Sequence, residues 1–130
     1  MQKPFHEELV TRLFQVASHK PDEECCGFVL GNDDPIQGFS WPYPMFNHAK
    51  QKKKEFVFDT KSFLATKKVF GSKLYAIYHS HVGRNRFLSP HDKRLMAETK
   101  LDMVLIVPAT ETLWWYTPDA RGPKLIARYP

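Results

Sequence analysis

The amino-acid sequence predicts an α/β protein in which a mixed β-sheet is flanked by helices. Apolar residues recur at helical spacing in two segments, and short apolar runs bounded by Gly or Pro alternate with these segments. Three further strand-like runs follow one another at the C-terminal end. Strands that alternate with helices and then occur consecutively indicate one mixed sheet. At 130 residues, 42% hydrophobic and 25% charged, we expect a single domain over 1–130.

The first elements are a helix and a buried strand. Residues 5–19 place apolar side chains on one helical stripe, and Pro21 ends that helix; the stripe contains Leu9, Val10, Leu13, Phe14 and Ala17. Residues 25–30 form a short apolar run, and Gly31 begins a turn that extends to Pro35. This run predicts a strand covered on both faces.

The middle of the chain is less regular. Residues 36–54 contain Pro42, Pro44 and a lysine cluster, which predict a weak strand about Phe39 followed by a mobile loop. The aromatic run 56–58 predicts another strand. A second helix is expected over 60–70, with Asp59 or Thr60 as its N-cap and Gly71 at its end.

The remaining elements follow a strand that is apolar on both faces. Residues 74–79 predict this strand, which runs into His-Ser-His, and 82–88 predict a loop. Ser89 as N-cap and Pro90 at the first helical position predict the next helix. Three strand candidates complete the chain at 103–107, 113–116 and 125–129. Of the neighbours Trp114 and Trp115, one is expected in the core and the other on a surface.

Composition limits the classes of protein. No stretch carries the 18 or more apolar residues of a membrane span, and the N-terminus lacks a signal-peptide core, so we expect no membrane partner and a cytoplasmic location. Cys25 and Cys26 are adjacent, which excludes a disulfide framework and favours small buried residues. The net charge of +5 suits an acidic partner or a nucleic acid. Because no aromatic pattern is interleaved with the lysines, a solvated face is favoured and a nucleic-acid partner is not expected.

Three residues have the chemistry of a metal site. His79 and His81 alternate on a strand, so both imidazoles point to the same side, with Cα atoms about 6.6 Å apart. Asp92 begins the following helix and can fold back to offer an oxygen. Two histidines and one carboxylate leave a fourth tetrahedral position for water, which is typical of a catalytic zinc site.

Simpler interpretations exist for each of these residues. A lone His-x-His is often a hydrogen-bonded turn, and Ser89 with Asp92 also fits a capping box. Because these residues occur together at one strand–loop–helix junction, a metal site is favoured over the simpler interpretations. The two roles are also compatible, since Ser89 can cap the helix while Asp92 reaches the ion. Ser80 points away from the histidines and is expected to support the backbone, and His91 is expected to face solvent.

His79-Ser80-His81, Ser89 and Asp92 reproduce the signature of the JAMM (JAB/MPN) zinc metallopeptidases, and the sequence resembles this family over about residues 5–116. The segment from Glu24 to Gly27 is similar to the family's Glu-x-Cys-Gly strand. This resemblance implies a core related to the cytidine-deaminase fold, a Zn²⁺ ion and peptidase or isopeptidase activity. It also selects Glu24, and not Glu23, as the acid/base.

The compact chain is similar to the prokaryotic and phage members of that family, which include sulfur-carrier-processing hydrolases and the peptidase domain of phage tail-assembly proteins. The resemblance therefore implies a protein or peptide substrate, such as a ubiquitin-like tail or a phage tail protein, with a virion-associated location in the latter case. Ubiquitin itself is disfavoured, because the chain has no room for the long insertions of eukaryotic deubiquitinases.

The remaining expectations concern secondary roles and alternatives. Ser89 is expected to donate a hydrogen bond to the developing oxyanion, and Arg84 and Arg86 to border the substrate groove. A nucleobase deaminase would need His-x-Glu and Pro-Cys-x-x-Cys, which the sequence lacks. A non-catalytic scaffold or tail-assembly protein is the alternative function, and the intact ligand set favours catalysis over it.

Overall fold

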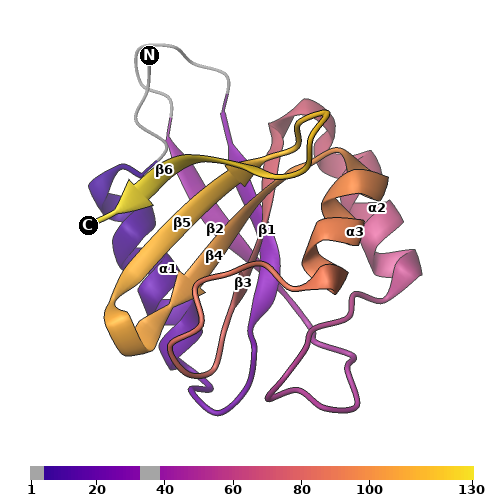
Figure 1. The fold of residues 1–130 in the computed structure, drawn as a ribbon. Coiled ribbons are helices and arrows are strands. Elements are labelled where there is room, and N and C mark those ends of the chain that lie inside the picture. Colours follow the sequence, from indigo (N-terminus) through magenta and orange to yellow (C-terminus); the bar gives the residue numbers. More distant parts are fainter. Residues whose placement is uncertain (1–4, 33–38) are drawn as a thin grey trace.

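A computed structural model describes residues 5–32 and 39–130 as one mixed six-stranded sheet with three α-helices (Figure 1). The strand order is β2-β1-β3-β4-β5-β6, and β3 and β4 form the parallel pair while the other neighbours are antiparallel. This architecture confirms the predicted fold class. The α-helices and strands are α1 Glu7–Ser18, β1 Cys26–Gly31, β2 Ser40–Met45, α2 Thr60–Phe70, β3 Leu74–Ser80, α3 Pro90–Thr99, β4 Asp102–Val107, β5 Thr112–Thr117 and β6 Lys124–Tyr129.

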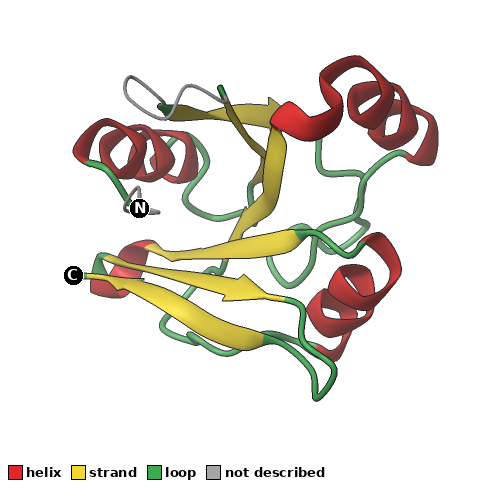
Figure 2. Cartoon of the chain, turned by 90° about the horizontal axis from the view of Figure 1, so that it is seen from above, coloured by secondary structure: helices red, strands yellow, loops and turns green. Residues whose placement is uncertain are grey.

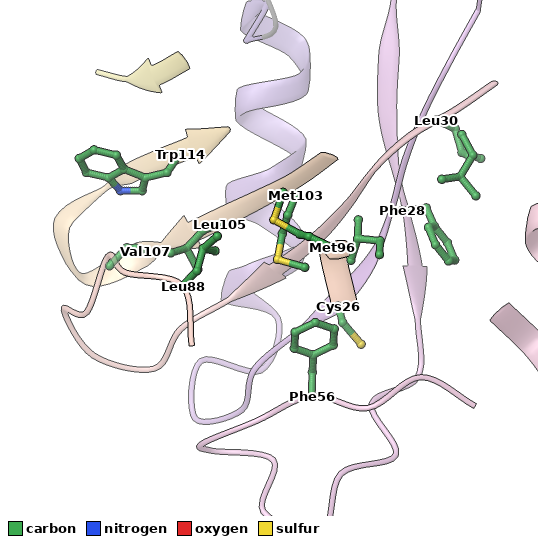
Figure 3. Packing of buried hydrophobic residues seen from close by; sticks show 12 residues of the cluster. Cys26, Phe28, Leu30, Phe56, Leu88, Met96, Met103, Leu105, Val107 and Trp114 are labelled. Carbon is green, nitrogen blue, oxygen red and sulfur yellow. The ribbon is translucent and has the colours of Figure 1, made fainter. Parts of the chain in front are cut away.

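Helices cover both faces of the sheet, so the protein has two apolar layers (Figure 2). Helix α1 packs on one face, where its buried side chains meet Val29, Ala76 and Tyr78. Helices α2 and α3 lie on the other face, over a cluster that includes Phe28, Ile77 and Met96 (Figure 3). Successive residues of one strand alternate between the two clusters, as the two-residue period of a strand requires.

The pairing of β1 with β3 positions the candidate site. The two strands are antiparallel, and Cys26 is paired with His79, so the start of β1 lies beside the end of β3. The amide of Cys25 donates to the Ser80 hydroxyl over 2.9 Å, and the amide of Ser80 donates to the Cys25 carbonyl over 3.0 Å. Ser80 therefore supports the backbone, as predicted, and residues 24–26 are fixed next to residues 79–81.

Gly27, the second residue of β1, is required by its packing. A Cβ atom at this position would lie 2.3 Å from the Tyr43 carbonyl oxygen and 2.6 Å from the ring of Tyr78. The ring of Tyr78, on the neighbouring strand β3, thus occupies the space that any other side chain at residue 27 would need.

Two predictions for the middle of the chain need correction. Residues 56–58 are not a strand, because the backbone of Val57 is bonded within the loop: its amide donates to Asn47 Oδ1, and its carbonyl accepts from the amide of His48. The weak strand predicted about Phe39 is present as β2, but it runs over Ser40–Met45 and thus includes Pro42 and Pro44. These prolines are tolerated because β2 is an edge strand. The turn expected at 31–35 lies outside the described residues from 33 onward.

The tryptophan pair also differs from the prediction. Trp114 and Trp115 are both buried, at 5% and 6% exposure, because each face of β5 is covered by one of the two apolar clusters.

Within the described ranges, no helix combines the length and apolarity needed to cross a bilayer.

Candidate metal centre

His79, His81 and Asp92 converge in a buried position at the end of β3. His79 is the sixth residue of β3 and His81 follows the strand, while Asp92 lies in the first turn of α3. The Nε2 atoms of the two histidines are 3.3 Å apart. Asp92 Oδ2 lies 3.1 Å from Nε2 of His79 and 3.7 Å from Nε2 of His81. Three donor atoms of the types that zinc prefers therefore face one point.

These separations fit a tetrahedral metal. Ligand bonds of about 2.0–2.1 Å place neighbouring ligand atoms of a tetrahedral zinc about 3.3–3.4 Å apart. The three observed separations bracket that value, and all three residues are at most 8% exposed. The donor set can hold a metal ion with a small adjustment of the side chains.

The loop after β3 orients His81. Its Nδ1 atom lies 2.7 Å from the Asn85 carbonyl oxygen, and because a carbonyl only accepts, Nδ1 carries the proton. The lone pair of His81 is then on Nε2, the atom that faces His79 and Asp92.

A different contact orients His79. Its ring stacks on Phe56 with ring centroids 4.6 Å apart, and its Nδ1 atom is buried without a hydrogen-bond partner among the described residues. Phe56 comes from the segment before α2 and is also part of the buried apolar cluster (Figure 3).

The charges of the three residues are coupled. Burial disfavours the ionised form of Asp92, but the nearby His79 and the hydrogen bonds from both histidines outweigh it and hold the pKa of Asp92 well below its usual range. Burial lowers the pKa of His79. Burial also opposes the charged form of His81, but its contacts with Asp92 and Asn85 prevail and raise the pKa of His81. A bound cation requires neutral imidazoles and an ionised carboxylate, so metal binding would have to release the proton that the raised pKa of His81 favours.

Glu24 lies beside this cluster. Its carboxylate oxygen and the ring nitrogens of His79 and His81 are all within 4.8 Å of one another, so these residues form a second, overlapping set of metal-ligand candidates. Glu24 is 6% exposed, and burial raises its pKa to about 7. Glu23 is partly exposed and has an ion-pair contact of 4.0 Å with Lys20. The structure thus brings Glu24, rather than Glu23, to the histidines.

Ser89 and Asp92 form a capping box at the start of α3. The Asp92 amide donates to the Ser89 hydroxyl oxygen over 3.1 Å, and the Ser89 amide donates to Asp92 Oδ2 over 2.8 Å. The same Oδ2 atom faces His79, so the capping bond fixes the carboxylate in the site. Asp92 can therefore serve in the capping box and in the candidate site at once, because its Oδ2 atom accepts from the Ser89 amide and still faces His79.

A comparison with protein families identifies the chain. The model of prokaryotic homologues of the JAB domain matches residues 6–117. The chain belongs to the prokaryotic JAB family. A solved structure with the same fold is the solution structure of a structural-genomics protein from Desulfitobacterium hafniense, with a TM-score of 0.71, 19% identity and coverage of 92% of this chain and 86% of that one. No curated protein matches the sequence.

The other predicted site residues of this JAB domain lie at the rim. Arg84 and Arg86 are exposed on the loop after β3, and the guanidinium of Arg86 lies 4.6 Å from the Phe87 ring and 4.9 Å from the Trp114 ring. Among the described residues, neither arginine has an ion pair with the buried cluster. Their role at a substrate groove stays a prediction.

One expectation for the JAB domain was wrong, and three residues were missed. His91 is half-buried and not solvent-facing, because the ring of Phe56 packs against it with centroids 5.4 Å apart. Asn85, Phe56 and Asn47 also shape the site. The spacing of residues could not reveal them, because Asn85 acts through its backbone carbonyl, and Phe56 and Asn47 contact residues that are distant in sequence. Cys25 and Cys26 are both free thiols; Cys26 is buried, as expected, whereas Cys25 is only partly buried.

Proposed function

We propose that this JAB domain is a zinc-dependent peptidase or isopeptidase. His79, His81 and Asp92 would hold the ion, and Glu24 would act as general base. The observation that carries the proposal is the buried convergence of two imidazole nitrogens and one carboxylate oxygen at 3.1–3.7 Å, with a second carboxylate beside them. Once bound, zinc supplies a Lewis acid that polarises the scissile carbonyl and lowers the pKa of water.

Glu24 and Ser89 have different roles in the proposed hydrolysis. The Glu24 carboxylate accepts a proton from the attacking water as the oxygen adds to the carbonyl carbon, and then delivers it to the amine nitrogen as the C–N bond breaks. A pKa of about 7 suits both transfers near neutral pH. The Ser89 hydroxyl oxygen accepts from the Asp92 amide, so its own proton remains free to donate to the carbonyl oxygen.

A non-catalytic scaffold is the alternative for a JAB domain. A scaffold needs neither the buried donor cluster nor a carboxylate held beside it, and both are present in this chain. Peptides, isopeptides and fusions with a ubiquitin-like or sulfur-carrier protein, or with a phage tail protein, are all substrates that such a centre could hydrolyse, within a cytoplasmic or virion-associated protein.

Metal content tests the first half of the proposal. We expect about one zinc per chain in freshly purified protein, and loss of most of it in His79→Ala, His81→Ala and Asp92→Ala, because each variant removes one ligand of three. Elemental analysis gives the measurement. A wild-type protein that neither contains zinc nor binds it on titration would show that the proposal is wrong.

A matched pair of variants tests the second half. Glu24→Gln should retain zinc and reduce turnover by about 10² to 10⁴, because the amide cannot accept the proton. Glu23→Gln is the control and should change turnover little. Hydrolysis of a peptide library by the two variants, with zinc content measured on the same samples, separates metal binding from catalysis. Equal activity in both variants would contradict the assignment of Glu24.

A further inference from the structure

The buried side chain of Asn47 is fully hydrogen-bonded next to the candidate base. Its Nδ2 group donates to the carbonyl oxygens of Glu24 and Glu55 over 2.9 and 3.0 Å. Its Oδ1 atom accepts from the amides of Ala49 and Val57 over 2.9 and 3.1 Å. Two donated and two accepted bonds are all that an amide side chain can form. Asn47 is 8% exposed, so loss of these bonds would leave buried backbone groups unpaired.

Asn47 bonds to Glu24 at the point where the pairing of β1 with β2 ends. The first residue of β1, Cys26, is paired with the last residue of β2, Met45. Continuing this register by two residues brings Asn47 opposite Glu24. Glu24 lies beyond the strand ladder, and its backbone bonds go to the segment after β2. Its carbonyl accepts from the Asn47 side chain, and its amide donates to the Lys52 carbonyl over 2.7 Å.

The peptide unit that joins Glu24 to Cys25 is held from two sides. Its carbonyl accepts from Asn47, and its amide donates to the Ser80 hydroxyl over 2.9 Å. Ser80 is the last residue of β3, the strand that carries His79, so one anchor belongs to the candidate metal centre. Asn47 supplies the other anchor. The direction in which the Glu24 side chain leaves the backbone therefore depends on both bonds.

The same asparagine also fixes an aromatic ring of the site. The Glu55 carbonyl and the Val57 amide, which are both bonded to Asn47, lie on either side of Phe56 in the chain. The Phe56 ring stacks on His79 with ring centroids 4.6 Å apart. One side chain thus connects the candidate base to the ring that packs against a candidate ligand.

We propose that Asn47 is a positioning residue of this centre and holds the Glu24 carboxylate beside His79 and His81 through the Glu24 backbone. Its four hydrogen bonds go to backbone atoms, so Asn47 acts through Glu24 and takes no part in proton transfer itself. A cavity of about 180 Å³ borders Glu24, Cys25 and Asn47, which leaves room for this segment to shift once the bond is lost. The role rests on the proposed hydrolytic function, because it is a role in that reaction.

Thiol reactivity in zinc-free protein tests the proposal without catalysis. The chain has two cysteines, so Cys26→Ala leaves a single thiol, on the residue that follows Glu24. Cys25 is only partly buried, and a reagent can reach it when its segment moves. In this background, Asn47→Ala should raise the rate of Cys25 alkylation by iodoacetamide about tenfold, because the peptide unit loses one of its two anchors. Mass spectrometry measures the rate.

Asp102→Ala in the same background is the matched control for a general loss of stability. Asp102 begins β4, and its carboxylate accepts from the Trp115 indole over 2.9 Å and from the Thr117 hydroxyl over 2.7 Å. This variant also removes side-chain hydrogen bonds, but it should change the alkylation rate less than about twofold. An unchanged rate in Asn47→Ala, or equal increases in the two variants, would overturn the positioning role.

Asn47→Asp keeps the test decisive if Asn47→Ala does not fold. A carboxylate of nearly the same size can still accept from the amides of Ala49 and Val57, but it cannot donate to the Glu24 carbonyl. The alkylation rate should again rise, although the added negative charge disfavours the reactive thiolate. A rate equal to that of the parent protein would contradict the role of the Asn47–Glu24 bond.

A double-mutant cycle in zinc-loaded protein tests the link to catalysis. Asn47→Ala should retain zinc and lower peptide turnover about 10- to 100-fold, as expected when a catalytic group is displaced. In the Glu24→Gln background, the same substitution should lower the residual turnover less than about twofold. Equal losses in the two backgrounds would mean that Asn47 serves the fold alone. If the wild-type protein hydrolyses no peptide, the proposed function fails, and the Cys25 rates still decide whether Asn47 holds Glu24.

Discussion

A single oxygen atom of Asp92 links the start of α3 to the candidate centre. One oxygen, Oδ2, accepts from the Ser89 amide and also faces Nε2 of His79, so the helix start and the metal site share it. The two-residue strand period is enough to predict that His79 and His81 face one side. Selecting Glu24 over Glu23 required a family resemblance, because both are acidic residues ahead of the same strand. The role of Asn85 could not be predicted, since it acts through its carbonyl group.

The raised pKa of Glu24 has a consequence for stability. Because burial raises the pKa from 4.5 to about 7, the folded protein binds this proton more tightly than the unfolded chain does. The contribution of Glu24 to the free energy of unfolding is therefore fully present below pH 4.5 and is lost as pH rises to about 7. In zinc-free protein, Glu24→Gln should be more stable than wild type by about 1–2 kcal/mol at pH 8, with little difference at pH 4.

Urea denaturation at the two pH values measures this effect. Glu23→Gln is again the matched control, because Glu23 is partly exposed. A wild-type protein that equals Glu24→Gln in stability at pH 8 would mean that Glu24 is solvated when the ion is absent.

At the scale of elements, boundaries marked by capping residues were predicted well. Helix α2 was expected over 60–70 and is observed there, with Asp59 as N-cap and Gly71 after its end. Helix α3 begins after Ser89 as expected. The segment 56–58 was misassigned because its aromatic composition suits a strand, while its backbone bonds go to the side chain of Asn47 and to residue 48. Composition alone cannot predict that the Asn47 side chain, and not a neighbouring strand, accepts the hydrogen bond from the Val57 amide.

Ser89 offers a way to separate helix capping from chemistry. Ser89→Ala removes the cap and should destabilise the protein by about 1 kcal/mol. Ser89→Gly should destabilise it by only about a few tenths of a kcal/mol. Both variants lose the hydroxyl, so both should lose turnover by about 10² to 10³ if Ser89 donates to the oxyanion. Thermal denaturation and peptide hydrolysis on the two variants make the comparison. If activity follows stability, so that Ser89→Gly stays active, Ser89 serves α3 alone.

The whole molecule should respond to zinc through the free energy of unfolding. A ligand present at a hundred times its Kd stabilises the folded state by about 2.7 kcal/mol when the unfolded chain does not bind it. The gain should shrink as pH falls below neutrality, because His81 has a raised pKa and must lose its proton to bind the ion. Thermal shifts with and without zinc, from pH 5.5 to 8, measure it. Asp92→Asn is the control and should show little gain at any pH.

The sheet order is the feature of the whole molecule that the sequence left open. A mixed sheet was predicted from the order of elements, but the chain alone does not reveal that β1 lies between β2 and β3. That neighbour relation brings Glu24 to the histidines, because β1 and β3 are antiparallel and Cys26 is paired with His79. Long-range pairing depends on packing between segments that are distant in sequence, and local patterns carry little information on it.

The origins of the site residues suggest how this centre could be re-engineered. His79, His81, Ser89 and Asp92 all lie within one contiguous segment, 79–92, whereas Glu24 lies just before β1 in the first half of the chain. Transplanting 79–92 from a relative would therefore exchange the proposed metal ligands together and leave the proposed general base, Glu24, in place. The two segments are joined by the β1–β3 pairing, and they are also coupled electrostatically, because the charges of His81 and Asp92 act on the pKa of Glu24.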